Sequence, residues 1–293
     1  MKKKHNIFLL FLLFSMSLLN ATDIIDNKSD LPSDLEKYLR ILLEEKETEI
    51  KKKAIETRNQ KEREINLQMV NIPEKNYAIQ QTEVTQTLYS KIMGELPTFF
   101  NEQGGNHPVV TVSLYDMVYF CNLLSTHVGL TPVYSVGGNT DVKTWNYTPH
   151  KGNAIKEEIT LNEQASGYRL PTKEEWEYSA RGGETFKFSG SNNIDDVAWY
   201  SGNTNSRNSH PKPVAQKKAN GYGLFDMTGN VAEVCWALAT YGSGEFCQFG
   251  GSYRDSKLFC ELNNTLSPAK ERWFWPDSST SYDTGFRILR LAE

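Results

Sequence analysis

Two long stretches of this 293-residue chain, residues 137–167 and 189–223, constrain its fold more than any other feature. Both are rich in Gly, Asn, Ser and Pro, which favour turns over helices and strands. Loops of that length are uncommon in a compact domain unless they are functional or are held by something other than secondary structure. The chain is nevertheless 39% hydrophobic and 12% aromatic, which is enough apolar material for a core. We therefore expect an α+β domain with much irregular loop structure.

Short apolar runs predict where the regular elements lie. The expected strands are residues 69–72, 77–79 and 109–112, and the expected helices are residues 84–93, 113–126 and 171–180. Ser113 is a typical N-cap with Asp116 in the first helical turn, and Gly182 and Gly183 follow the third helix as a helix stop.

Residues 1–21 have the pattern of a secretory signal peptide. Three lysines at positions 2–4 precede an apolar run at 7–19, and Ala21 is small enough for a peptidase site. The run is short for a membrane-spanning helix, which needs about 20 residues. We expect an exported protein, periplasmic or at the cell surface, in contact with a membrane only if the signal remains uncleaved.

Residues 22–66 predict a charged helical spacer, and residues 67–293 predict the folded domain. A narrow stripe of leucines at three-to-four spacing begins at Leu31 and fades after Glu44. A short coiled coil that dimerises the chain is the alternative interpretation of this stripe. The formal charge of −4 and the mixture of acidic and basic residues give no reason to expect a nucleic-acid partner.

The four cysteines leave several interpretations open. An even count in an exported chain permits two disulfides in any of three connectivities, whereas Cys121 and Cys235 could equally be small buried hydrophobes. The full set is Cys121, Cys235, Cys247 and Cys260. Five scattered histidines give no zinc or iron spacing.

One turn has the composition of a calcium site. Asp226 and Glu233 bracket a turn at residues 229–230, so that both carboxylates could meet the main-chain carbonyls of Gly229 and Val231 at one ion. A turn with an acidic rim and no ion is the alternative.

Four phrases in fixed order identify a family. They are GYRLPTKEEWEY at 167–178, GLFDMTGN at 223–230, GGSY at 250–253 and GFR at 285–287. Together with TEVT at 82–85 they resemble the sulfatase-modifying factor family, whose best-known member is the formylglycine-generating enzyme. The resemblance covers about residues 70–290. It implies a C-type-lectin-like fold that is stabilised by calcium and has unusually little regular secondary structure.

The resemblance also implies metal ligands. The first calcium site of the family corresponds to Asp226, Gly229, Val231 and Glu233 in this chain. A second family site would begin at Asn203 and Thr204, but its later acidic ligand has no clear match. The expected cofactor is therefore structural calcium.

Catalytic members of the family oxidise a sulfatase cysteine to formylglycine, with copper(I) held between two cysteines five residues apart. The resemblance places those two positions on Asp255 and Cys260, so that only Cys260 and Ser252 remain of the reactive group. Copper(I) prefers two soft thiolates, and a carboxylate is a poor substitute. Copper is therefore not expected.

We expect a non-catalytic module that binds a protein or a small ligand. The aromatic and polar stretch at 259–282 is either its recognition surface or core packing. A formylglycine-generating oxidase that uses Cys260 and an unrecognised second ligand is the alternative function.

Overall fold

The computed structural model describes residues 33–97, 104–151, 153–204, 210–236, 246–262, 272–274 and 281–292. The chain forms two compact units, residues 1–61 and 62–293. The signal sequence predicted at 1–21 lies outside the described residues, as does most of the aromatic stretch, at 263–271 and 275–280.

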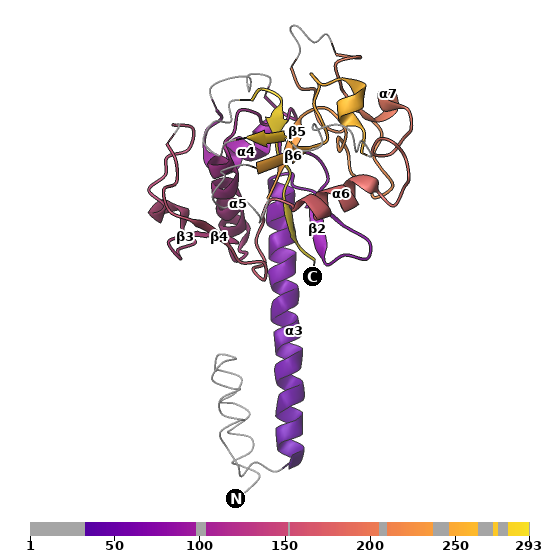
Figure 1. Cartoon of the computed structure of the whole chain (residues 1–293). Helices are drawn as coiled ribbons and strands as arrows, with labels where there is room; N and C mark the ends of the chain where they lie inside the picture. Colours follow the sequence, from indigo (N-terminus) through magenta and orange to yellow (C-terminus); the bar gives the residue numbers. More distant parts are fainter. Residues whose placement is uncertain are drawn as a thin grey trace, which may run out of the picture. The chain divides into compact units, whose positions relative to one another are not determined.

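Apart from one helix of 32 residues, the structure consists of short elements with long connections (Figure 1). In chain order they are α3 (Ser33–Glu64), β1 (Met69–Asn71), β2 (Tyr77–Gln80), α4 (Gln86–Met93), α5 (Leu114–Val128), β3 (Tyr134–Val136), the 3-10 helix η1 (Val142–Thr144), β4 (Ile159–Leu161), α6 (Lys173–Arg181), α7 (Ile194–Val197), β5 (Ala232–Cys235), β6 (Phe246–Phe249), the 3-10 helix η2 (Lys257–Cys260), β7 (Arg272–Phe274), β8 (Thr284–Gly285) and β9 (Leu289–Leu291).

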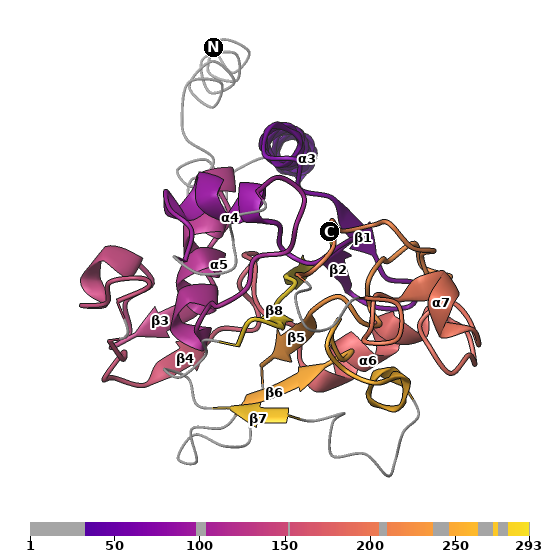
Figure 2. The same ribbon diagram turned by 90° about the horizontal axis from the view of Figure 1, so that it is seen from above.

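Three small sheets organise the unit at 62–293. One has the strand order β1-β2-β9, the second is the β3-β4 pair, and the third has the order β7-β6-β5-β8. In the third sheet β6 is antiparallel to β5 and β7, whereas β8 is parallel to β5. Helices α4 and α5 lie on one side of this sheet and α6 lies on the other (Figures 1 and 2).

The predicted helix boundaries follow from local capping. Ser113 and Asp116 form a capping box at the start of α5, with the Asp116 amide donating to Ser113 Oγ at 3.0 Å. Thr172 and Glu175 form the same motif at α6, which Gly182 ends in the left-handed conformation at φ +61°. These predictions are confirmed to within one or two residues.

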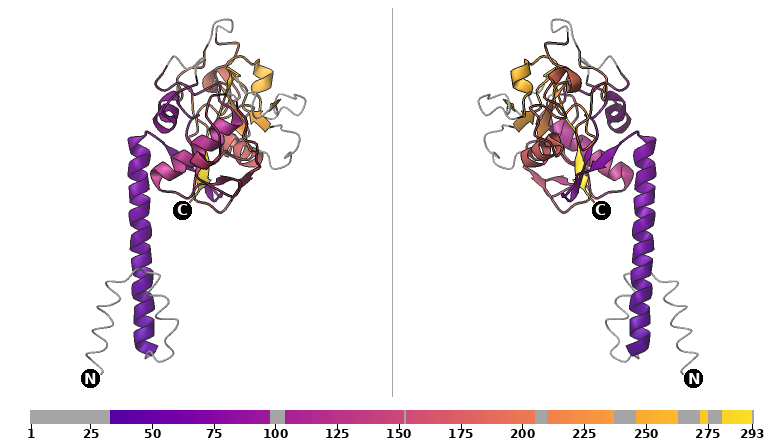
Figure 3. Two further views of the ribbon diagram at one scale, coloured as in Figure 1. Left: turned by 90° about the vertical axis from the view of Figure 1, so that its left-hand side faces the viewer. Right: turned by 90° about the vertical axis from the view of Figure 1, so that its right-hand side faces the viewer.

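The strand predicted at residues 109–112 is wrong. Val109, Val110 and Val112 are all buried and Thr111 is partly exposed, so burial does not alternate from residue to residue as in a strand with one solvent-facing side. Thr111 between them has φ +58°, which an extended strand does not tolerate. Pro108 forms an isolated bridge with Thr85, and the Val109 amide donates to the Val84 carbonyl at 2.9 Å, but no continuous ladder is formed at 109–112. The strand β4, the 3-10 helix η1 and the short helix α7 lie within the stretches predicted as loops, whose other described residues form turns and irregular structure (Figure 3).

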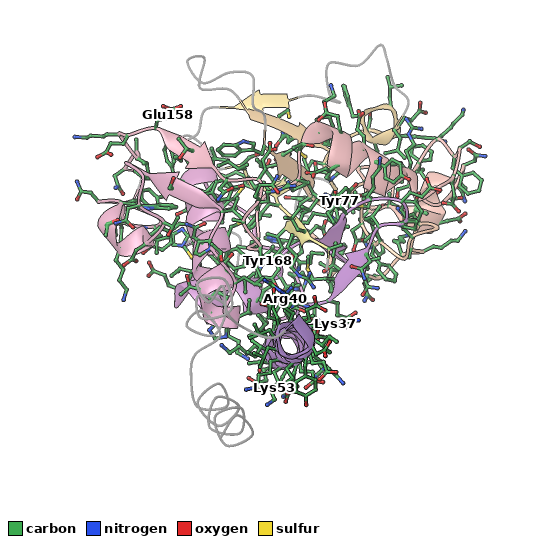
Figure 4. The ribbon with its side chains drawn as sticks, turned by 90° about the horizontal axis from the view of Figure 1, so that it is seen from below. Lys37, Arg40, Lys53, Tyr77, Glu158 and Tyr168 are labelled. Carbon is green, nitrogen blue, oxygen red and sulfur yellow. The ribbon has the colours of Figure 1, made fainter. Side chains whose placement is uncertain are left out.

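Three apolar clusters make up the core. The largest surrounds α5 and includes Phe120, Tyr168 and Phe286. A second packs Trp176 of α6 on Phe249 of β6, with ring centroids 5.5 Å apart. The third joins Phe188 and α7 to Cys260. In Figure 4 Tyr77 and Tyr168 lie among densely packed side chains, and Glu158 lies at the edge of the unit.

The helix α3 is highly charged along its length. Arg40 pairs with Glu36 at 3.1 Å, and Lys53 pairs with Glu49 at 3.3 Å, each four residues apart. Charged side chains, including Lys53, surround the helix axis in Figure 4. No helix in the described part of the chain is both long enough and apolar enough to cross a bilayer. The division into a spacer at 22–66 and a domain at 67–293 stays a prediction.

Candidate functional site

A fully buried arginine organises the candidate calcium turn. Arg287 comes from the GFR phrase and has no exposed surface. Its Nε and Nη2 donate to the two carboxylate oxygens of Glu233 at 2.6 and 2.5 Å. The remaining hydrogens go to the main-chain oxygens of Gln80, Gln81 and Phe225. All five guanidinium hydrogens are therefore satisfied, which is what burial of an arginine requires.

A second buried carboxylate accepts hydrogen bonds from residues of the same turn. Glu83, from the TEVT phrase, accepts from the Asn230 side chain at 3.2 Å and from the Val231 amide at 3.3 Å. Asn230 also accepts from the Lys212 amide at 2.8 Å. Three of the phrases that carry the family resemblance therefore meet at one place, although they are far apart in the sequence.

This cluster contains more acid than base. Glu83, Asp226 and Glu233 are buried together with Arg287. Burial, followed by the charges of Asp226 and Glu233, raises the pKa of Glu83 well above its ordinary value. Burial also raises the pKa of Asp226 to about 6, although the Ala215 amide and Arg287 act to lower it. Protons or a cation are needed to balance the surplus negative charge.

The four predicted calcium ligands differ in how well they fit an ion. Asp226 Oδ2 accepts from the Ala215 amide at 2.6 Å, but Asp226 Oδ1 is buried without a hydrogen-bond partner. Glu233 is already engaged, because its oxygens take two bonds from Arg287 and one from Trp176 Nε1 at 2.7 Å. Asp226 therefore fits a cation, and Glu233 is better described as the counter-ion of Arg287.

Gly229 and Val231 contribute backbone to the same turn. Gly229 has φ +76°, and a Cβ there would lie 2.4 Å from the Trp199 carbonyl oxygen, so only glycine fits. Among the described residues, no group of three or more His, Cys, Asp and Glu side chains is arranged to hold a metal. An ion here would thus draw on main-chain carbonyls as well as on Asp226.

The two residues predicted to begin a second calcium site are used in a local turn. Asn203 donates to the Ala198 carbonyl at 2.9 Å and accepts from the Tyr200 amide at 3.0 Å. Thr204 Oγ1 lies 2.7 Å from the Tyr253 carbonyl oxygen and 2.9 Å from the Tyr200 carbonyl oxygen, and its single proton goes to one of the two. Each side chain thus has a structural role in this turn.

Asp255, which the resemblance aligns with the first reactive cysteine, is a buried structural group. Its Oδ2 accepts from the Ser252 amide at 2.9 Å and from Ser252 Oγ at 2.7 Å. Ser252 Oγ is 3.4 Å from Asp283 Oδ2 as well, but the shorter contact takes the single hydroxyl proton. The carboxylate therefore holds the turn that follows the two glycines.

Cys260 lies at the end of η2 and faces inward. It is 2% exposed, and its Sγ lies 2.8 Å from the position that a Cβ on Gly251 would take. The hollow beside it, lined by Trp176, Phe249 and Phe259 among others, has a volume of about 10 Å³, which is room for about one water molecule. Cys260 thus brings one sulfur to the turn at Gly251, while the resemblance puts Asp255 where a second thiolate would be needed, and a thiolate with a carboxylate does not suit copper(I).

None of the four cysteines, all of which lie in the described part of the chain, forms a disulfide in the structure. Cys121 and Cys235 are completely buried, as expected for small hydrophobes. Cys247 lies directly opposite Cys235 on the neighbouring strand, a pairing that the sequence did not reveal.

Sequence reasoning missed the roles of Glu83 and Arg287. Both lie in the family phrases, but as isolated charged residues they resemble ordinary surface groups. The apolar neighbours in the sequence could have revealed them, since Val84 follows Glu83 and Phe286 precedes Arg287. A charged side chain next to core residues needs a buried partner of opposite charge or hydrogen-bonding groups.

Among the described residues, small sheets, a buried Arg–Glu centre and long irregular connections characterise this α+β domain. The sequence profile described as "Sulfatase-modifying factor enzyme 1-like domain" matches residues 46–292. The chain belongs to this family.

Named relatives agree with that assignment. The chain is 40% identical over 184 residues to the chaperone protein LppX of Paenibacillus barcinonensis, a match that covers 57% of this chain and 64% of that protein. It is 39% identical over 79 residues to the formylglycine-generating enzyme of Mycobacterium tuberculosis, covering 23% of this chain and 26% of that enzyme. The matches thus span less than two thirds of these relatives.

Solved structures show the same fold. Treponema denticola variable protein 1 superposes with a TM-score of 0.62 at 30% identity, covering 77% of this chain and 92% of that one. CarF superposes with a TM-score of 0.56 at 28% identity, covering 74% and 87%. PvdO from Pseudomonas aeruginosa, at 19% identity and a TM-score of 0.51, covers 77% and 91% and shares the fold alone.

Proposed function

We propose that this protein is an exported, non-catalytic member of the family that binds another polypeptide. The observation that carries the proposal is Asp255, a hydrogen-bonded carboxylate at the position of the first reactive cysteine. Because only Cys260 supplies sulfur there, the pair of soft donors that the oxidation uses is missing. Trp176 and Phe249 line the small hollow beside Cys260, and this hollow leaves little room for a substrate peptide.

An assay for aldehyde formation tests the non-catalytic part. The purified chain is incubated under air with copper(I) and a cysteine-containing sulfatase peptide, and the peptide is then probed with a hydrazide. A formylglycine-generating enzyme serves as the positive control. We expect no aldehyde from the folded chain. Aldehyde that accumulates with wild-type protein and disappears with Cys260→Ser would establish the oxidase instead.

Two observations support a polypeptide as the partner. Leu258 and Phe259 on η2 are 55% and 39% exposed, so the same short helix that buries Cys260 presents two large apolar side chains outward. Exposed apolar and aromatic side chains are typical anchors for protein partners. The likeness to a protein named as a chaperone agrees with this choice.

Binding of a reduced, carboxymethylated model polypeptide tests the proposed surface. Its fluorescence anisotropy should rise on titration with the chain, and the double substitution Leu258→Asp with Phe259→Asp should weaken binding at least tenfold. Ile50→Asp is the matched control, because Ile50 is 52% exposed on α3, away from η2 in the sequence. Equal weakening by both variants, or no binding by wild type, would overturn the assignment of this surface.

We also propose a structural calcium ion at the Asp226 turn. The unpartnered Asp226 Oδ1 and the surplus of buried carboxylates support it. When bound, the ion would supply positive charge that offsets this surplus, with Asp226 and the carbonyls of Gly229 and Val231 as its ligands. Glu233 would remain paired with Arg287.

A further inference from the structure

The sheet β7-β6-β5-β8 places two cysteines opposite each other. Cys235 ends β5 and pairs in register with Cys247 of β6 (Figures 1 and 2 show the two strands side by side). Directly opposite residues in an antiparallel pair project to the same face, with Cα atoms about 4.5 or 5.5 Å apart. A disulfide needs Cα atoms about 4.4–6.8 Å apart, so either type of pair is within its range.

Both thiols lie in the same apolar cluster. Cys235 and Cys247 are 0% and 3% exposed and share their surroundings with Trp176 and Phe249. Burial raises the pKa of Cys235, and the nearby Cys247 raises it further, while burial raises the pKa of Cys247 to about 11. Neutral sulfur is therefore favoured in this cluster, which suits a disulfide better than a pair of metal-binding thiolates.

We propose that Cys235 and Cys247 form a disulfide when the chain folds in an oxidising compartment, and that this bond fixes the β5–β6 edge of the sheet. The bond would close residues 236–246 into a covalent loop. One end of the bond, Cys235, lies two residues after Glu233, the counter-ion of Arg287, on the same strand. In the cell, formation of this disulfide depends on the proposed export. In vitro, its formation can be tested whatever the location of the protein and whether or not it is catalytic.

The oxidant is a low-molecular-weight disulfide such as oxidised glutathione. The thiolate of one cysteine attacks a sulfur of the oxidant, forms a mixed disulfide and releases one glutathione thiolate. The second protein thiolate then attacks the protein sulfur of the mixed disulfide, so that the Cys235–Cys247 bond forms and the second glutathione thiolate leaves. The two protons lost by the protein thiols appear on the two glutathione thiols. Because both sulfurs are buried in the folded state, these steps precede closure of the core.

Refolding of the full chain from the reduced, unfolded state in a glutathione redox buffer tests the proposal. After alkylation and digestion without reductant, mass spectrometry should find the peptides of Cys235 and Cys247 joined, with Cys121 and Cys260 alkylated. The oxidised protein should also melt at a higher temperature than the same protein after reduction.

Two variants show whether the difference in melting temperature comes from the Cys235–Cys247 bond. The double substitution Cys235→Ala with Cys247→Ala should remove the difference in melting temperature between oxidised and reduced protein. The matched control Cys121→Ala changes another completely buried cysteine and should retain that difference. Recovery of natively folded wild type, judged by near-ultraviolet circular dichroism, with Cys235 and Cys247 both alkylated would overturn the proposal. A bond to Cys121 or Cys260 in its place would do the same.

Discussion

At the scale of single residues, the family phrases that identify this chain have structural roles in it. Arg287 has all its hydrogens bonded, and its partner Glu233 is 1% exposed. A buried ion pair of this kind is costly to break, because either partner alone would be an uncompensated charge in the core. The sequence similarity around GFR and GLFDMTGN therefore reflects the fold more than the oxidation chemistry.

The pair of Arg169 and Glu175 gives a pH-dependent prediction. Burial acts to raise the pKa of Glu175, but two 2.6 Å bonds from Arg169 and the cap at Thr172 outweigh it and lower that pKa below its ordinary 4.5. A lowered folded-state pKa gives stability that is present above pH 4.5 and is lost as the pH falls through the folded value.

We therefore expect Glu175→Gln to destabilise the protein by about 2–3 kcal/mol at neutral pH. The difference in unfolding free energy between wild type and the variant should be constant above about pH 5 and should shrink below 4.5. Urea unfolding at a series of pH values measures it. A difference that does not change with pH would show that the ionised Glu175 is not what stabilises this turn.

At the scale of elements, α6 is fixed to the loops at its C-terminal end by a buried asparagine. Asn220 donates to the carbonyls of Ser179 and Ala180, and its oxygen accepts from the amides of Tyr222 and Leu224. Such bonds hold a long loop in place without helix or strand. The irregular stretch at 189–223 is thus ordered in part by side-chain to main-chain bonds.

Two helix-ending glycines provide a matched test of this contact. Gly94 and Gly182 both have positive φ, at +84° and +61°. A Cβ at Gly94 would meet nothing within 4 Å, whereas at Gly182 it would lie 2.8 Å from Asn220 Cγ. Gly94→Ala should cost about 1 kcal/mol of stability for its backbone strain. Gly182→Ala should cost at least about 1 kcal/mol more because it also overpacks the contact. Equal costs in denaturant unfolding would contradict this role of Asn220.

How well the sequence predicts a contact depends on how far apart its two residues lie along the chain. The capping boxes at Ser113 and Thr172 involve residues three apart, so they could be recognised without a structure. The pairs Arg287–Glu233 and Glu83–Asn230 join residues 54 and 147 apart, and no local pattern reveals them. The strand predicted at 109–112 was wrong for a similar reason, because the positive φ of Thr111 and the burial of the three valines depend on the whole fold.

At the scale of the whole molecule, the calcium ion proposed at Asp226 should contribute to stability. A ligand that binds only the folded state stabilises it by about 2.7 kcal/mol at 100 times its Kd. For a domain of this size that corresponds to roughly 5–10 °C. Removal of calcium with a chelator should lower the melting temperature by that amount, and added calcium should restore it.

Two substitutions separate the proposed roles in this cluster. Asp226→Asn should abolish the response to calcium. Glu233→Gln should lower stability in the presence and in the absence of the ion, because it unpairs Arg287. A melting temperature that is indifferent to the chelator in wild type would remove the proposed calcium ion.

We propose that a carboxylate stands in this chain where catalytic relatives have one of two sulfur donors. Anaerobic copper(I) titration distinguishes the two cases, with Cys235 and Cys247 replaced by Ala in every sample so that only the site at residues 255–260 is compared. We expect Asp255→Cys to gain one equivalent of tightly bound copper(I), Cys260→Ser to remove this gain, and Asp255→Asn to bind none. Tight copper(I) binding by the chain with its native Asp255, lost on Cys260→Ser, would contradict the proposal.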